Sequence, residues 1–539
     1  MDVIRTYIES FLKSKVRAIY TLLSICIVVY FMWHHFMFKS WDFIVYMQNA
    51  QHFLNSGLYF ELGRPPLISW ILAFFHFIVS WNFAGYLYIT TIATLFCYAT
   101  YKLSRELQYN PLIFLIISAS PFLLIEGLFN GTELLTYVCL QIACILLIKK
   151  SSLSGLALGL AGLAHYTTIL LAPLVIVLAD IKKITKATIL FFIPWGFWFY
   201  WNFINYGNMF ASIADQYALN ILHRSYTIQP VNYAHFLEVL GLTFPLALLG
   251  FAIVATSLVL EGVKLCKKIE YRMHTKKMLA KNRDLVSQFL TQHNEKILFI
   301  AIAIIITYKY VTVPLKFSRY LFLLILPASF FTYYAGRKLI LYFKKQNQKR
   351  IITIVIFLLV ASTIFITGMF AAFKSPTYSE DLELAQTIQN NISYYGAENC
   401  TFISNNWPLL LDNEIQAYPF SKKELLQHAV NEGFGALFFT TSNEPTYAKN
   451  ITFLKSLQNT SERVFRSKYS LILPDKCIAQ PKFTQTYLEK ISTEVYMMHN
   501  YNLATDPCRS IFHDSESLEK SCRFINLRGW SLSEIRPIE

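Results

Sequence analysis

A single acidic residue, Asp42, follows the first long apolar stretch of this 539-residue chain. Tyr46 lies one helical turn after it, and the segment ends in Arg64, Pro65 and Pro66, which form a rigid turn. A carboxylate at a membrane surface is costly unless it has a partner or a function. Because a carboxylate can accept the proton of an attacking hydroxyl group, we predict that Asp42 is a general base. The alternative is that Asp42 only ends the apolar stretch or caps the next helix.

Further charged or titratable residues lie at the ends of later apolar segments. They are Glu133, His165, Lys309, Lys316 and Arg319, all predicted to face the same side of the membrane as Asp42. Carboxylates and several cations at one depth are typical of a site that binds an anionic lipid headgroup beside a general base. We therefore predict a catalytic or binding role for this whole set, with Glu133 as a second candidate acid.

Each of these residues also has a simpler explanation. Glu133 is an acid in the first turn of a helix, a position that the helix dipole favours. His165 could be a hydrogen-bonded packing residue. Lys316 and Arg319 could extend to the membrane interface without binding a ligand, and Arg64 with its prolines could form only a turn. The coincidence of all of these residues on one side of the membrane is what indicates a site.

The composition places the chain among membrane proteins. Hydrophobic residues make up 55% of it, and the mean hydropathy is +0.40. Many windows of about 18 nearly uncharged residues are long enough to cross a bilayer. The net charge of +15 arises from basic residues in short loops, as expected for cytoplasmic connections. No nucleic-acid-binding motif is present. The sequence thus predicts a polytopic α-helical membrane protein that contacts lipid and not nucleic acid.

The charge pattern predicts the topology. The apolar runs lie at 17–37, 66–80, 84–103, 111–127, 132–148, 153–180, 187–204, 234–262, 297–315, 319–336 and 351–373. All basic clusters fall on the cytoplasmic side if 66–80 is a helix lying at the outer face and if 153–180 divides into two helices near His165. This arrangement gives about eleven spans, a cytoplasmic N-terminus and an extracytoplasmic C-terminus. We expect the plasma (inner) membrane as the location.

Two polar regions are predicted outside the membrane. The first outer loop covers 38–83 and belongs to a transmembrane domain of residues 1–373. Residues 374–539 alternate helical stretches, at 379–391 and 421–431, with short apolar runs typical of strands, which predicts a small α/β domain. The strand-like runs are Thr401–Ser404, Ala436–Thr440 and Ser470–Leu473.

Four of the nine cysteines lie in this tail: Cys400, Cys477, Cys508 and Cys522. An even number in an extracytoplasmic domain favours two disulfides, which allow three pairings. We favour a bond between Cys508 and Cys522. Zinc is less favoured because the tail contains no Cys-x-x-Cys spacing.

Three motifs together resemble the GT-C glycosyltransferases, which include protein O-mannosyltransferases and lipid A aminoarabinose transferases. The first motif is Asp42-x3-Tyr46-x3-Ala50-x2-Leu54-x2-Gly57-x-Tyr59 followed by Arg64-Pro65-Pro66-Leu67. The second is the glycine-rich segment 155–173 around His165, and the third is Ser318–Leu321. The resemblance covers roughly residues 1–373, and many members of the family also carry an extracytoplasmic C-terminal domain.

The resemblance implies a function. Members of the family transfer a sugar from a polyprenyl-phosphate donor to a lipid, glycan or protein acceptor at the outer membrane face, with inversion. It implies that Asp42 is the general base and that cations hold the phosphate leaving group, which needs charge stabilisation. The residues assigned to the donor phosphate are Arg64, His165, Lys309, Lys316 and Arg319, and those assigned to substrate contact are Tyr46 and Tyr59.

Two positions depart from the family pattern. Phe43 follows Asp42 where many members have a glutamate, so a paired-acid or divalent metal site is not supported and no cofactor is predicted. His165 stands where relatives often have arginine, and a neutral imidazole binds phosphate less strongly. A transporter or flippase of lipid-linked sugars is the alternative function, although the chain shows no convincing inverted repeat of the kind found in transporters. A membrane receptor that displays the tail explains neither Asp42 nor Arg64.

Overall fold

The fold was examined in a computed structural model. It describes residues 2–37, 39–55, 60–178, 180–206, 209–217, 229–270, 278–313, 316–342, 376–419, 423–440 and 449–477, with single positions at 348, 354 and 362. Contacts divide the chain into two compact units. The helical unit comprises 1–38, 65–201 and 228–373, and the sheet unit comprises 39–64, 202–227 and 374–539. Residues 39–64 were predicted to belong to the transmembrane domain, and contacts group this segment with the tail.

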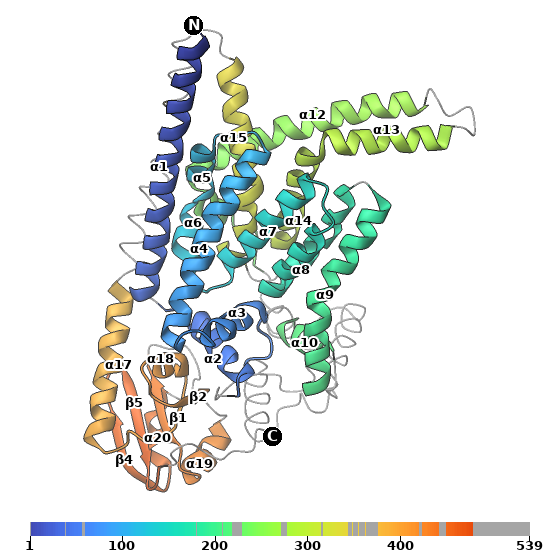
Figure 1. The fold of residues 1–539 in the computed structure, drawn as a ribbon. Coiled ribbons are helices and arrows are strands. Elements are labelled where there is room, and N and C mark those ends of the chain that lie inside the picture. The colour runs from blue at the N-terminus through green and yellow to red at the C-terminus, as the bar shows by residue number, and fades with distance from the viewer. Residues whose placement is uncertain are drawn as a thin grey trace. The chain divides into compact units, whose positions relative to one another are not determined.

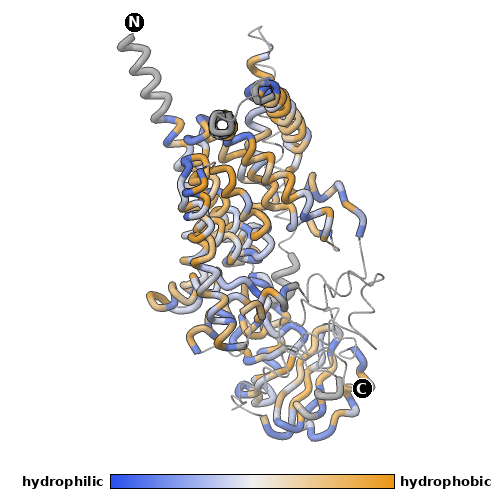
Figure 2. The backbone as a smooth tube through the Cα atoms, turned by 90° about the vertical axis from the view of Figure 1, so that its right-hand side faces the viewer, coloured by the Kyte–Doolittle hydropathy of each residue, from blue (hydrophilic) through white to orange (hydrophobic). Residues whose placement is uncertain are grey.

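The helical unit consists of helices, most of which are rich in apolar residues (Figures 1 and 2). Its helices are α1 (Asp2–Met37), α3 (Leu67–His76), α4 (Trp81–Glu106), α5 (Pro111–Ser118), α6 (Pro121–Glu126), α7 (Glu133–Ile148), α8 (Ser154–Ala164), η1 (Tyr166–Leu178), α9 (Ile181–Tyr206), α11 (Ala234–Leu240), η3 (Gly241–Thr243), α12 (Phe244–Glu270), α13 (Met278–Gln292), α14 (Asn294–Thr312), η4 (Ser318–Leu324) and α15 (Ile325–Tyr342).

Four stretches in the described residues are long and apolar enough to cross a membrane. They are Lys15–Phe36, Trp81–Glu106, Ile181–Asn205 and Ala234–Lys267. The chain is therefore an integral membrane protein, as its composition predicts. The expected number of about eleven spans stays a prediction, and the run 351–373 lies largely outside the described residues.

Several apolar runs are interrupted where local chemistry favours a break. The run 111–127 was expected to be one span but forms α5 and α6, because Pro121 lacks an amide hydrogen and Ser120 caps the second helix through the backbone N–H of Leu123. The run 66–80 forms only the ten-residue helix α3, which is too short to cross a bilayer.

The run 153–180 divides at His165, as the charge pattern predicts. Helix α8 ends at Ala164, His165 takes an extended conformation, and the 3-10 helix η1 follows. The glycines of α8 let it approach α9 closely: a Cβ atom on Gly155 would lie 2.6 Å from the carbonyl carbon of Ala187. One on Gly159 would lie 2.5 Å from the carbonyl oxygen of Phe191. Only glycine permits this packing.

The sheet unit contains a small α/β fold, which confirms the predicted fold class (Figure 1). Its five-stranded sheet has the order β2-β1-β3-β5-β4. Strands β2, β1 and β3 run parallel to one another, and β5 runs antiparallel to both of its neighbours, β3 and β4. Its elements are α2 (Trp41–Phe53), α10 (Ala211–Tyr217), α17 (Pro376–Tyr394), β1 (Phe402–Ser404), α18 (Trp407–Asp412), β2 (Ala417–Pro419), α19 (Lys423–Asn431), β3 (Gly435–Phe439), α20 (Ile451–Ser456), β4 (Thr460–Phe465) and β5 (Tyr469–Pro474).

Strands β1, β3 and β5 and helices α17 and α19 match segments predicted from the sequence. Strands β2 and β4 were missed. Strand β2 is only three residues long and ends in Pro419, and β4 exposes Ser461, Glu462 and Arg463, so neither shows the apolar run used to recognise strands.

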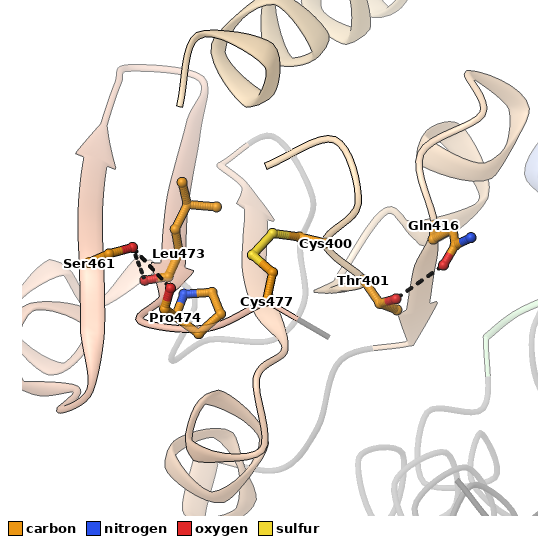
Figure 3. The surroundings of a disulfide bond; sticks show 7 residues. All are labelled: Cys400, Thr401, Gln416, Ser461, Leu473, Pro474 and Cys477. Atoms are coloured by element: carbon orange, nitrogen blue, oxygen red, sulfur yellow. Dashed lines mark hydrogen bonds between the residues drawn. A yellow bond between two sulfur atoms is a disulfide. The ribbon is translucent and has the colours of Figure 1, made fainter. Parts of the chain in front are cut away.

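A disulfide joins the two ends of this sheet fold (Figure 3). Cys400 lies just before β1 and Cys477 lies just after β5, with their Cα atoms 4.9 Å apart. The predicted bond between Cys508 and Cys522 falls outside the described residues. Because Cys400 and Cys477 bond to each other, Cys508 and Cys522 are the two tail cysteines left, and a bond between them stays a prediction.

Candidate active site

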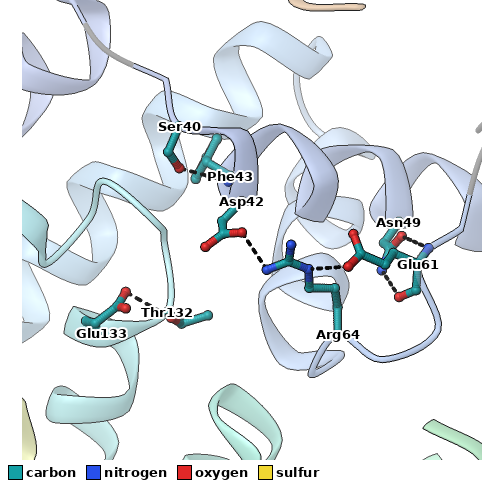
Figure 4. Close-up of polar contacts among 8 residues, drawn as sticks. All are labelled: Ser40, Asp42, Phe43, Asn49, Glu61, Arg64, Thr132 and Glu133. Carbon is teal, nitrogen blue, oxygen red and sulfur yellow. Dashed lines mark hydrogen bonds and ion pairs between the residues drawn. The ribbon is translucent and has the colours of Figure 1, made fainter. Parts of the chain in front are cut away.

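Asp42 lies in the first turn of α2 (Figure 4). Ser40 is the N-cap of this helix, and its Oγ accepts a hydrogen bond of 3.1 Å from the backbone N–H of Phe43. The amide groups at the start of a helix carry a partial positive charge, which favours a carboxylate at this position. The cap therefore fixes where α2 begins and places the Asp42 carboxylate in a setting that stabilises its negative charge.

Arg64 links Asp42 to a second acid, Glu61 (Figure 4). Its Nη1 lies 2.7 Å from Oδ1 of Asp42, and its Nε lies 3.1 Å from Oε1 of Glu61. The guanidinium carbon also lies 5.5 Å from the centroid of the Tyr46 ring, a cation–π distance. The side chains of Asp42 and Arg64 are 20% and 18% exposed, so the ion pair is only partly screened by solvent.

Asn49 holds the turn that presents Arg64. Its Nδ2 donates to the carbonyl oxygen of Glu61 at 3.0 Å, and its Oδ1 accepts from the backbone N–H of Glu61 at 2.8 Å. Asp42, Tyr46 and Asn49 are spaced by four and three residues, so they share one face of α2. Asn49 and Glu61 were not predicted as site residues, although the spacing of Asn49 from Asp42 and Tyr46 is a signal that identifies it.

A second polar group lies in the helical unit, around Lys309 of α14. Its Nζ donates to Oγ1 of Thr167 at 2.6 Å, and the same oxygen lies 2.7 Å from Nδ1 of His165. Lys309 is 3% exposed, and its ammonium also lies 5.4 Å from the centroid of the Tyr320 ring. The break at His165 makes this contact possible, because it turns the start of η1 toward α14.

Two further predicted residues interact with Lys309. Both Arg319 and Glu133 interact with it electrostatically, Arg319 as a like charge and Glu133 as an opposite one. Glu133 is buried and accepts a hydrogen bond of 2.9 Å from Oγ1 of Thr132. The structure thus brings Glu133, His165, Lys309 and Arg319 into one cluster. The hydroxyl residues that join the cluster were not predicted, because threonine is common in apolar helices and carries no distinctive signal.

Lys316 makes different contacts from those expected of a phosphate ligand. Its ammonium donates to the carbonyl oxygens of Val311, at 2.9 Å, and of Val313. Its backbone N–H donates to Oε1 of Gln229 at 3.0 Å. A lysine that binds the last carbonyl groups of a helix stabilises the end of that helix, so Lys316 caps α14 in this structure. Its role in phosphate binding stays a prediction.

Of the two tyrosines predicted to contact the substrate, one lies within the described residues. Tyr46 is buried, with its ring beside Arg64. Tyr59 lies outside the described residues. Within the described part of the chain, no group of three or more histidine, cysteine, aspartate or glutamate side chains is arranged to hold a metal ion.

Comparisons with known proteins identify the fold. No protein-family model matches the sequence, and no curated protein matches it. Among solved structures, the chain is similar to ArnT from Cupriavidus metallidurans bound to undecaprenyl phosphate. The TM-score is 0.51 at 10% sequence identity, and the match covers 84% of this chain and 97% of ArnT. The chain therefore has the fold of ArnT over most of its length.

Proposed function

We propose that the protein is an integral-membrane glycosyltransferase that takes a sugar from a polyprenyl-phosphate donor. The observation that carries this proposal is the fold shared with ArnT, a structure solved with undecaprenyl phosphate bound, over 84% of this chain. The acceptor is a lipid, glycan or protein at the outer face of the membrane, with the N-terminus in the cytoplasm. The test described below includes donors that carry hexoses, mannose among them, and pentoses, so that it also identifies the sugar.

Asp42 has the chemistry of the general base in this proposal. A single displacement at the anomeric carbon forms the bond to the acceptor oxygen and breaks the bond to the phosphate oxygen, which inverts that carbon. Asp42 accepts the proton that the acceptor hydroxyl loses. The guanidinium of Arg64, held between Asp42 and Glu61, keeps the carboxylate oriented.

The cation cluster of the helical unit suits the leaving group. The phosphate departs with its negative charge and needs stabilisation more than a proton. Lys309 and Arg319 lie together although both are cations, an arrangement that an anionic ligand would stabilise. Thr167 and His165 orient the Lys309 ammonium. Glu133 is the second candidate acid, and its electrostatic interaction with Lys309 favours a supporting role.

An apolar groove in the same unit fits the polyprenyl chain. It has a volume of about 990 Å³ and is lined almost wholly by apolar side chains of α11, α12, α14 and α15. Val311 lies at the groove, and its carbonyl oxygen binds the ammonium of Lys316. An apolar channel with a cation beside it matches a lipid whose only charge is a terminal phosphate. We therefore assign the groove to the donor lipid, with Lys316 holding the end of α14 beside it.

The test is sugar transfer by purified protein in liposomes, with radiolabelled polyprenyl-phosphate sugars and a panel of acceptors. Wild type is compared with Asp42→Asn and with Glu383→Gln, a control at an exposed position of α17. We expect transfer by wild type and the control, and a loss of at least about 10²-fold in Asp42→Asn, the scale of general-base catalysis. Equal transfer by all three proteins would remove Asp42 from the chemistry and point to Glu133.

The alternative, a transporter of lipid-linked sugars, makes a different prediction. A transporter would move a labelled lipid between leaflets without transferring its sugar to any acceptor. Both wild type and Asp42→Asn would then leave the donor lipid chemically unchanged. Lipid movement in the absence of any transfer product across the panel would overturn the glycosyltransferase proposal.

A further inference from the structure

We infer that helix α18 of the C-terminal sheet fold positions Asp42 for the reaction, with Trp407 and Asp412 as positioning residues. The inference rests on the proposed function for its chemistry, and on contacts within the sheet unit for its geometry. It gives the C-terminal domain a place in the active site, where the sequence predicted only a separate extracytoplasmic domain.

Helix α2 has two adjacent faces with different partners. Asp42 and Tyr46 lie on the face that meets the Arg64 guanidinium. Trp41 and Val45 are each one residue earlier, so they lie on the neighbouring face, about 100° around the helix axis. Val45 is fully buried and belongs to the apolar core of the sheet fold. This short helix therefore connects the Asp42–Arg64 ion pair on one face to the apolar core on the other.

That core is the main apolar cluster of the C-terminal domain. Besides Val45 its members come from α17, α18 and the strands, among them Ile388, Trp407, Leu437 and Leu471. More than 300 residues separate Val45 in sequence from the other members of this core. Its place there is therefore a tertiary contact and not a consequence of chain connectivity. The loop helix therefore folds as part of the C-terminal domain.

Two side-chain contacts fix how α2 sits on α18. The rings of Trp41 and Trp407 meet edge to face, with centroids 5.7 Å apart and an interplanar angle of 75°. Just before the helix, Nζ of Lys39 lies 2.5 Å from Oδ1 of Asp412. The two contacts lie at opposite ends of α18, because Trp407 begins this helix and Asp412 ends it. Two separated anchors resist both sliding and rotation of α2.

Both anchors lie next to the carboxylate in sequence. Trp41 is the neighbour of Asp42, and Lys39 is three residues before it. Any displacement of α2 on α18 is therefore transmitted to the Asp42 carboxylate with little attenuation. A misplacement of about 1 Å of a catalytic group can cost on the order of 10²-fold in rate. A purely structural contact would lower stability when weakened, but it would not alter turnover by the folded enzyme.

The test is a charge exchange across the Lys39–Asp412 pair in the full-length protein. The proteins are wild type, Asp412→Lys, Lys39→Asp and the double exchange, with Asp475→Lys as a control at an exposed site of the same domain. Thermal unfolding and steady-state transfer are measured on each. We expect both single variants to lose between about tenfold and 10²-fold in kcat, with the donor KM unchanged. The double exchange should recover most of the loss, and the control should match wild type.

The two measurements separate the two ideas. A non-additive shift of the unfolding midpoint shows that residues 39 and 412 are coupled, and it needs no activity at all. If wild type transfers sugar and the single variants keep its kcat, or if the double exchange recovers stability but not kcat, the positioning role is overturned. If coupling is measured while wild type itself transfers nothing, the contact stands and the proposed function fails. Asp412→Asn serves where Asp412→Lys does not fold.

Discussion

The close contact between α8 and α9 gives the sharpest prediction about the helical unit. Replacing Gly155 with alanine adds a Cβ atom that would lie 2.6 Å from the carbonyl carbon of Ala187 and 2.9 Å from its Cα. Ordinary van der Waals contact begins at 3.4 Å. The obstacle is backbone, not the end of a flexible side chain, so the added methyl group cannot be accommodated by a change of rotamer.

The nearest atom to that Cβ would be the carbonyl oxygen of Ala187, so the two helices must separate by more than about 1 Å at this point, a shift expected to cost about 1–3 kcal/mol. Alanine favours the helix by up to about 1 kcal/mol over glycine, which offsets part of that cost. We expect a net loss of about 1–2 kcal/mol in the free energy of unfolding, which corresponds to a fall of about 1–3 °C in the thermal midpoint for a unit of this size. Transfer should fall as well, since α8 ends directly at His165, whose imidazole contacts the Thr167 hydroxyl that binds Lys309.

The matched control is Gly196→Ala in α9, where an added Cβ would meet no atom within 4 Å. Both variants make the same chemical change in neighbouring helices of the same unit. Thermal unfolding in detergent should show Gly155→Ala below wild type and Gly196→Ala at or slightly above it. Equal midpoints for the two variants would refute the packing argument, because the main difference between the sites is the space around the new methyl group.

Three further outcomes are expected. Thr167→Val removes the acceptor of the buried Lys309 ammonium and should cost about 1–3 kcal/mol and weaken donor binding in a KM measurement, whereas Thr167→Ser should retain both. The double variant Cys400→Ser/Cys477→Ser opens a loop with a sequence separation of 77, and should destabilise the sheet fold by up to roughly 4–5 kcal/mol on the chain-entropy account, measured by limited proteolysis. Burial lowers the pKa of His52, so its contribution to stability is present above about pH 6.5 and is lost as the pH falls; His52→Gln should flatten the decline of the thermal midpoint between about pH 7 and pH 5.

Local chemistry made several features predictable. The split at His165 follows from basic residues at both ends of one apolar run, and the alternation of helical and apolar stretches in the tail identified β1, β3 and β5. The sequence also selected Glu133, Lys309 and Arg319, because charged residues at the ends of apolar segments are rare and expensive. The interruption between α5 and α6 was missed although Pro121 marks it, since hydropathy alone does not register a missing amide hydrogen.

Contacts between distant segments could not be predicted in the same way. Asn49 and Glu61 became visible only when the loop was seen folded back on α2, since an asparagine and a glutamate are ordinary loop residues. Lys316 was assigned to phosphate, but its contacts with the carbonyl groups of Val311 and Val313 depend on where α14 ends. The likeness of fold to ArnT, by contrast, agrees with the resemblance carried by the three residue motifs, although overall identity is only 10%.

The sequence by itself determined that this protein lies in a membrane, that it carries a small α/β fold after its helices, and which charged residues stand at the ends of its apolar segments. These features depend on composition and on neighbours a few residues apart, which hydrophobicity and helix geometry govern directly. Only the tertiary structure decided that Arg64 pairs with Asp42 and Glu61, that Thr167 joins His165 to Lys309, and that α2 belongs to the core of the C-terminal fold. Such contacts are set by the close packing of segments far apart in the chain, where the partner of a side chain is chosen by shape and charge in space and not by position in the sequence.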